Sequence, residues 1–201
     1  MRLVFVIVAV LALCQCASSS PRGEGRRAIV IIGLAAAADQ ADPRYTMLWR
    51  RIDEESGGFT DYGWGGDRLE FTTHSGSTVR APGLPGEFEI ARVDPGVYAL
   101  DGMFATLNED GVTYTAQGSI IGPERPAFEA RAGEVIFLGI WQASIDGHLA
   151  VVRPWRLSQD DLRAVARAAE IEGVIHLRAT RVESVPCAPR RIHPARARQV
   201  C

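Results

Sequence analysis

The stretch Glu87-Phe-Glu-Ile-Ala-Arg-Val-Asp-Pro-Gly-Val-Tyr-Ala-Leu100 indicates the fold class. Side chains of a strand alternate between its two faces, so Phe88 and Ile90 share one face and the intervening glutamates share the other. This alternation predicts a half-buried strand over residues 87–93. Asp94-Pro95-Gly96 then predicts a tight turn, because Pro presets φ and Gly accepts a positive φ.

Similar short β-rich runs, separated by turn residues, extend from this stretch in both directions. Such spacing is typical of a sandwich or a barrel, so we expect a mainly β fold, an antiparallel β-sandwich. Residues 134–141 are almost continuously apolar and predict the central strand. The other expected strands are residues 28–34, 45–52, 68–73, 97–107, 112–118, 127–130 and 149–155.

One α-helix is expected near the C-terminus, over about residues 158–172. Ser158 has the character of an N-cap, and apolar residues then recur at helical spacing up to Gly173, which predicts the stop. The helix should pack on the sheet, and residues 174–182 should follow it as an edge strand.

The composition excludes several classes of protein. The 201 residues are 47% hydrophobic and 23% charged, which argues against a disordered chain, a coiled coil or a collagen-like fibre. The chain contains 22 Arg and no Lys. Chemistry that depends on Lys, such as the phosphate-binding loop, Schiff bases and Ser-Lys dyads, is therefore ruled out.

The first residues have the parts of an export signal. A basic start is followed by an apolar run that ends at Cys14, too short for a membrane span, which needs about 20 residues. Leu13-Cys14-Gln15-Cys16 resembles the lipobox of bacterial lipoproteins, although Gln15 stands where a small residue is usual. The resemblance implies a signal peptide over residues 1–15, acylation of Cys16 and a tether over residues 16–27.

Ala17 is not the Asp that this family associates with retention in the inner membrane, so the resemblance implies the outer membrane, facing the periplasm. The alternative is ordinary signal cleavage after Ser19, which would leave a soluble periplasmic protein. Both alternatives export the chain.

A second resemblance concerns the body of the chain, expected as one domain over residues 28–185. Asp94-Pro-Gly-Val-Tyr98 and the segment Phe128–Gly139 resemble the turn and strand pattern of prealbumin-like β-sandwich domains in uncharacterised bacterial lipoproteins. The resemblance covers about 45 residues and favours the sandwich, but it assigns no site.

Cysteine and histidine supply few reactive groups. Cys187 and Cys201 form an even pair in an exported chain, which predicts a disulfide. No His lies at metal-ligand spacing from another, so we expect no metal and no cofactor. An enzyme would need His74 or His148 to meet an acid and a nucleophile in one cleft, and we expect no enzyme.

A glycine-rich loop between Phe59 and Asp67 is the best candidate for ligand binding. Its two aromatic rings, Tyr62 and Trp64, could form a platform for a sugar or a peptide, while Asp61 and Asp67 could hydrogen-bond hydroxyl groups. The alternative is that both rings fold back as lids over the end of the core.

The tail over residues 186–201 carries four Arg and no acid, so it could touch anionic headgroups or an acidic partner. The net charge of -2 and the export signal argue against nucleic acid. The sequence therefore predicts a lipid-anchored, non-catalytic interaction or structural module of the cell envelope, whose partner is an envelope protein or a glycan. The alternative is a soluble periplasmic module that binds a ligand through Tyr62 and Trp64.

Overall fold

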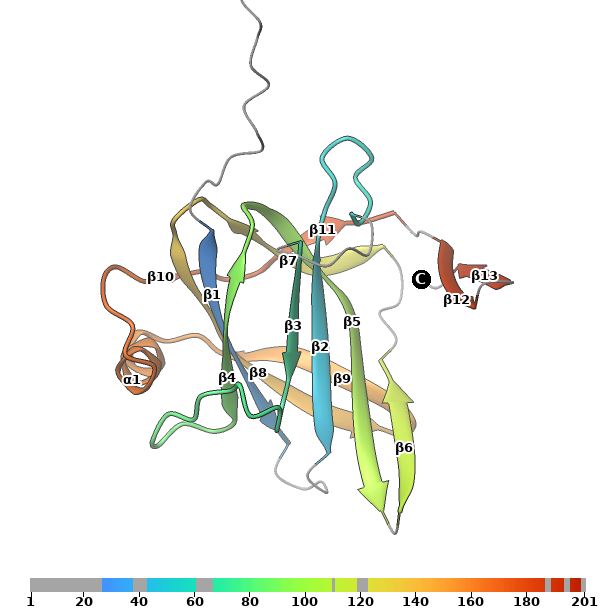
Figure 1. The fold of residues 1–201 in the computed structure, drawn as a ribbon, viewed down its shortest axis with the longest axis horizontal. Coiled ribbons are helices and arrows are strands. Elements are labelled where there is room, and N and C mark those ends of the chain that lie inside the picture. The colour runs from blue at the N-terminus through green and yellow to red at the C-terminus, as the bar shows by residue number, and fades with distance from the viewer. Residues whose placement is uncertain are drawn as a thin grey trace, which may run out of the picture.

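The computed structural model describes residues 27–37, 43–60, 67–109, 111–118, 123–186, 189–193 and 196–199. Two β-sheets face each other and one α-helix covers the outer face of one of them (Figure 1). The expected mainly β sandwich with a C-terminal helix is confirmed.

The first sheet has the strand order β10-β8-β1-β4, with β9 also paired to β8. Its strands are β1 (Ala28–Ala36), β4 (Glu87–Val93), β8 (Val135–Asp146), β9 (Leu149–Arg156) and β10 (His176–Leu177). The continuous apolar run forms β8, which lies inside the sheet as expected. Most pairs in the fold are antiparallel, but β8 runs parallel to both β1 and β10.

The second sheet has the order β11-β7-β5-β2-β3, with β6 paired to β5. Its strands are β2 (Arg44–Arg51), β3 (Arg68–Thr72), β5 (Gly96–Glu109), β6 (Val112–Gln117), β7 (Glu124–Ala130) and β11 (Arg181–Ser184). In the expected tail, β12 (Pro189–His193) and β13 (Arg196–Gln199) form a separate antiparallel pair that the sequence did not predict.

The core between the sheets is built around three aromatic rings. Trp49 of β2 meets Phe128 of β7 and Trp141 of β8 edge to face, at ring-centroid distances of 5.3 and 5.4 Å. Such geometry contributes about 0.5–1.5 kcal/mol per pair beyond the burial of apolar area. Because β2 and β8 belong to different sheets, the contact between Trp49 and Trp141 joins the two layers.

Helix α1 (Gln159–Ala168) packs on the outer face of the first sheet through Leu162 and Val165. The Ser158 hydroxyl accepts a hydrogen bond from the backbone amide of Asp161 at 3.1 Å, so Ser158 is the N-cap, as predicted. The helix ends before Gly173, because Glu170 already adopts a left-handed φ of 53°. Within the described ranges, no helix combines the length and apolarity needed to cross a membrane.

The segment expected as one edge strand over residues 174–182 is divided between the two sheets. His176–Leu177 pairs with β8 of the first sheet, and Arg181–Ser184 pairs with β7 of the second. This segment therefore links the two layers at their edge.

Candidate functional site: a pocket at the edge of the sandwich

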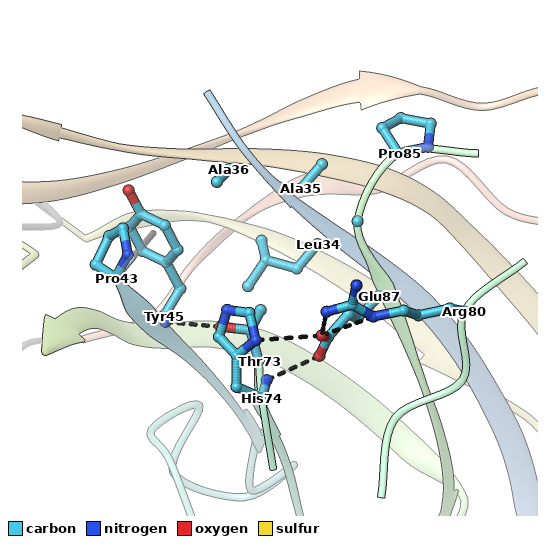
Figure 2. Close-up of a pocket in the computed structure, with 11 residues that line it drawn as sticks. Leu34, Ala35, Ala36, Pro43, Tyr45, Thr73, His74, Arg80, Pro85 and Glu87 are labelled. Carbon is cyan, nitrogen blue, oxygen red and sulfur yellow. Dashed lines mark hydrogen bonds and ion pairs between the residues drawn. The ribbon is translucent and has the colours of Figure 1, made fainter. Parts of the chain in front are cut away.

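The pocket lies at one end of the sandwich, where β3 ends and β4 begins. It has a volume of about 260 Å³. One wall is apolar and the other polar (Figure 2). The lining residues are Leu34, Ala35, Ala36, Pro43, Tyr45, Thr73, His74, Arg80, Pro85, Gly86 and Glu87.

The polar wall is organised around the carboxylate of Glu87, whose side chain is only 7% exposed. One oxygen, Oε2, accepts from the backbone amide of His74 and from the hydroxyl of Thr78, both at 2.8 Å. The other, Oε1, accepts from Arg80 Nε at 3.2 Å and from Arg80 Nη2, and it lies 3.4 Å from His74 Nδ1. Both oxygens of Glu87 are therefore fully used within the protein.

Two glutamates on the same face of β4 have pKa values shifted in opposite directions. Burial acts to raise the pKa of Glu87, but the donors from His74, Thr78 and Arg80 outweigh it and hold this pKa below its usual value. Burial raises the pKa of Glu89, and a hydrogen bond from Ser77 offsets this only in part. The face of β4 that carries the two glutamates is therefore also covered, at least in part. The alternation along this strand predicted only one buried face.

The apolar wall exists because β4 starts late beside β1. The two strands pair only as far as Leu34 and Glu87, whereas β1 continues along β8 to Ala36. Gly86 turns the chain away with φ of 81°, and a Cβ built on it would lie 2.2 Å from the carbonyl oxygen of Leu34. Glycine is required at this close approach, and the turn leaves the space beside Ala35 and Ala36 to the pocket.

His74 meets an acid in this pocket, as an enzyme would have required of it. Its backbone is left-handed with φ of 57°, and its ring faces Glu87 (Figure 2). The nearby Thr78 hydroxyl donates to the carboxylate of Glu87. A hydroxyl nucleophile would instead donate to the imidazole, so Thr78 is a support for the carboxylate.

The base of the predicted ligand loop lies elsewhere, at the end of the second sheet where β2 ends and β3 begins. Arg51 Nε pairs with the Asp67 carboxylate at 2.8 Å, and the backbone amide of Arg51 donates to the Asp67 carbonyl oxygen at 2.8 Å. On the other side, the Thr60 amide donates to the Arg51 carbonyl oxygen at 3.0 Å. Asp67 thus closes the loop at its base.

Two guanidinium groups lie over the ring of Phe59 at this base. The central carbon of Arg50 is 5.0 Å from the ring centroid, and that of Arg125 is 5.4 Å away. Arg50 Nη1 also contacts the buried carboxylate of Asp101 at 3.4 Å. These contacts fix the point at which the loop leaves the sheet.

The remaining predicted site residues lie outside the described ranges. They are Asp61, Tyr62 and Trp64 of the loop, Cys16 of the lipobox, and the predicted disulfide partners Cys187 and Cys201. Within the ranges that are described, no three side chains of His, Cys, Asp or Glu gather as a metal site.

The sequence did not indicate the pocket, since its polar groups share no local spacing. His74 and Glu87 are 13 positions apart, and only the fold of the loop between β3 and β4 brings them together. The one usable signal is the concentration of His, Ser, Thr and Arg in that loop, directly before a strand that starts with Glu.

Comparisons with known proteins give two distant structural similarities. No protein-family model matches the chain, and no curated protein matches it. A proposed cell adhesion protein from Bacteroides ovatus is similar over 65% of this chain and 44% of its own, at 8% identity and a TM-score of 0.29. The T6SS lipoprotein TssJ1 from Pseudomonas aeruginosa is similar over 66% of this chain and 99% of its own, at 16% identity and a TM-score of 0.24. These values are too low to transfer a function to this chain.

Proposed function

We propose that this chain is an exported lipoprotein, anchored through Cys16 to the outer membrane and facing the periplasm, where it acts as a non-catalytic interaction or structural module. The leader and the lipobox-like Leu13–Cys16 segment support export and acylation. The sandwich starts at Ala28, which is fully buried in β1, and this supports the interpretation of residues 16–27 as a tether between lipid and domain.

The observation that favours a structural role concerns the buried Thr, Asp, Glu and Arg side chains among the described residues, whereas the buried Nε1 of Trp49 has no hydrogen-bond partner. Each of these six side chains forms at least one hydrogen bond within the protein, whereas a catalytic group must keep an atom for its substrate. These side chains are Thr46, Thr73, Glu87, Asp101, Arg125 and Asp161.

Detergent phase partition of the native chain beside a Cys16→Ala variant tests the anchor. Two acyl chains give stable membrane attachment, so the native protein should enter the detergent phase and the variant should remain in the aqueous phase. Equal partition of both forms would remove the anchor from the proposal.

The second candidate is a soluble periplasmic module that binds a sugar or a peptide through Tyr62 and Trp64. The contacts of Arg50 and Arg51 at the loop base favour it, because a binding loop gains affinity when its ends are held in advance. Of the four residues expected to contact the ligand, Asp67 is already paired with Arg51, which leaves Asp61, Tyr62 and Trp64 for this role.

Trp64→Ala distinguishes this candidate from a core lid. Loss of binding to soluble cell-wall glycans and peptides, at an unchanged melting temperature, would support the binding loop. A large fall in melting temperature would support the lid. Trp155→Ala is the matched control, since Trp155 is 46% exposed on β9.

The disulfide between Cys187 and Cys201 remains part of the proposal. It would close a 15-residue segment and stabilise the protein by at most about 3 kcal/mol. Intact mass with and without reductant would detect it.

A further inference from the structure

In the described part of the chain, the pocket next to Glu87 has the geometry of a short strand position that no segment occupies. Beyond Leu34, β1 keeps its partner on the β8 side and has none of β4 on the other. The amide of Ala37 donates to Ala143 of β8 at 2.8 Å. Peptide groups of successive residues point to opposite edges of a strand, so the N–H and C=O of Ala36 point toward the pocket.

The polar end of the pocket favours a ligand group that accepts hydrogen bonds over one that donates them. The Glu87 oxygens are filled by His74, Thr78 and Arg80, so a ligand amine would find no lone pair there. Only Nε and Nη2 of Arg80 donate to Glu87, and the Arg80 side chain is 72% exposed. Figure 2 shows its third nitrogen directed away from Glu87, toward the side where Ala35 and Pro85 lie.

We propose that the pocket binds the C-terminal end of an extended peptide, which pairs with β1 at Ala36 and directs its terminal carboxylate to Arg80. The peptide would run in line with β4 and antiparallel to β1, so its last residue arrives where β4 begins. In the opposite direction its ammonium group would meet the saturated carboxylate of Glu87.

The size and lining of the pocket fit a chain end with small apolar side chains. Its volume of about 260 Å³ lies below the usual range for whole ligands, about 300–1,000 Å³, and the start of β4 blocks passage of a longer strand. Leu34, Pro43 and Pro85 supply the apolar contact. Recognition therefore combines backbone pairing, an apolar side chain and one charge-assisted hydrogen bond.

The test is a fluorescence anisotropy titration of the full-length protein in detergent. The probe is the peptide Gly-Ser-Ala-Val labelled with fluorescein at its amino end, made once with a free carboxylate and once with a carboxamide. The free acid should bind saturably below about 1 mM, and the amide should bind about tenfold more weakly. Absence of saturable binding of the acid, or equal affinity for both peptides, would overturn the proposal.

Two variants and one control locate the binding. Arg80→Gln should reduce the affinity for the acid about tenfold, to that for the amide, while Glu87 keeps its donors from His74 and Thr78. Ala36→Trp should block both peptides by filling the pocket. Arg92→Gln, an exposed arginine at the far end of β4, should bind as the native protein does.

If Arg80→Gln melts far below the native protein, Ala36→Trp becomes the decisive variant for peptide binding, because this substitution leaves the Glu87 contacts intact. Unchanged binding in Ala36→Trp contradicts the proposal. The role of the peptide as a partner of the envelope module rests on the proposed function. The peptide titration and the Cys16→Ala partition are separate measurements, so a failure of the peptide proposal can be distinguished from a failure of the proposed function.

Discussion

The carboxylate of Glu87 lies 2.8 Å from the backbone amide of His74 and fastens the start of β4 to the loop that follows β3. β3 and β4 are edge strands of different sheets, so this contact ties the two layers together at their open side. The hydrogen bonds around Glu87 lower its pKa in spite of burial, and that gives the contact a pH dependence.

Glu87→Gln should destabilise the protein by about 1–3 kcal/mol at pH 7, because an amide cannot accept all of these donors. A carboxylate with a lowered pKa in the folded state contributes stability above its unfolded-state pKa and loses it as the pH falls through its folded-state pKa. The gap between the native protein and the variant should therefore narrow toward acid. Urea unfolding across this range measures it, with exposed Glu70→Gln as control; a constant gap would contradict the account.

Glu89→Gln should have the opposite effect at neutral pH. Burial raises the pKa of Glu89, so its ionised form costs stability in the folded state. The variant should unfold at a higher urea concentration than the native protein at pH 7. This advantage should vanish at acid pH, where Glu89 is protonated and neutral. A lower stability of Glu89→Gln at pH 7 would show that the carboxylate has a stronger partner than Ser77.

Gly139→Ala should destabilise the fold by about 2 kcal/mol or more. Gly139 has φ of 81°, and a Cβ there would lie 2.3 Å from the carbonyl oxygen of Arg156, next to the register shift between β8 and β9. Gly147→Ala is the control: its φ of 59° is also left-handed, but nothing lies within 4 Å of the added carbon. Its cost should stay near 1 kcal/mol. Equal melting temperatures for the two variants would rule out the close approach as the cause.

Local signals predicted much of the fold. The bounds of β4 agree with the alternation of residues 87–93, and all of the apolar run 134–141 except its first residue lies in β8, inside its sheet. Ser158 caps α1 as predicted, because capping depends on residues only three positions apart.

The remaining features depend on contacts between distant residues. The parallel pairing of β1 with β8 joins segments about a hundred positions apart, and no local pattern sets it. The helix ends at Ala168, before the predicted stop at Gly173, because Glu170 already adopts the left-handed conformation. In the tail, the Pro and Arg residues form no strand pattern, so the strands β12 and β13 were not predicted.

The pocket at Glu87 was not predicted, for the same reason. The ion pair of Asp67 with Arg51 of β2 likewise depends on a contact that no local pattern indicates. Alternation placed Glu87 on the face of β4 opposite Phe88, but alternation along a strand says nothing of what covers that face. Arg80 and His74 reach it only through the turns of their loop.

Intact mass spectrometry of the native protein beside Cys16→Ala tests the central claim most directly. The account predicts a native chain that starts at Cys16 and carries two or three acyl chains, and a variant that carries none. An unmodified native chain that starts near Ser20 would contradict it and would favour the soluble ligand-binding module.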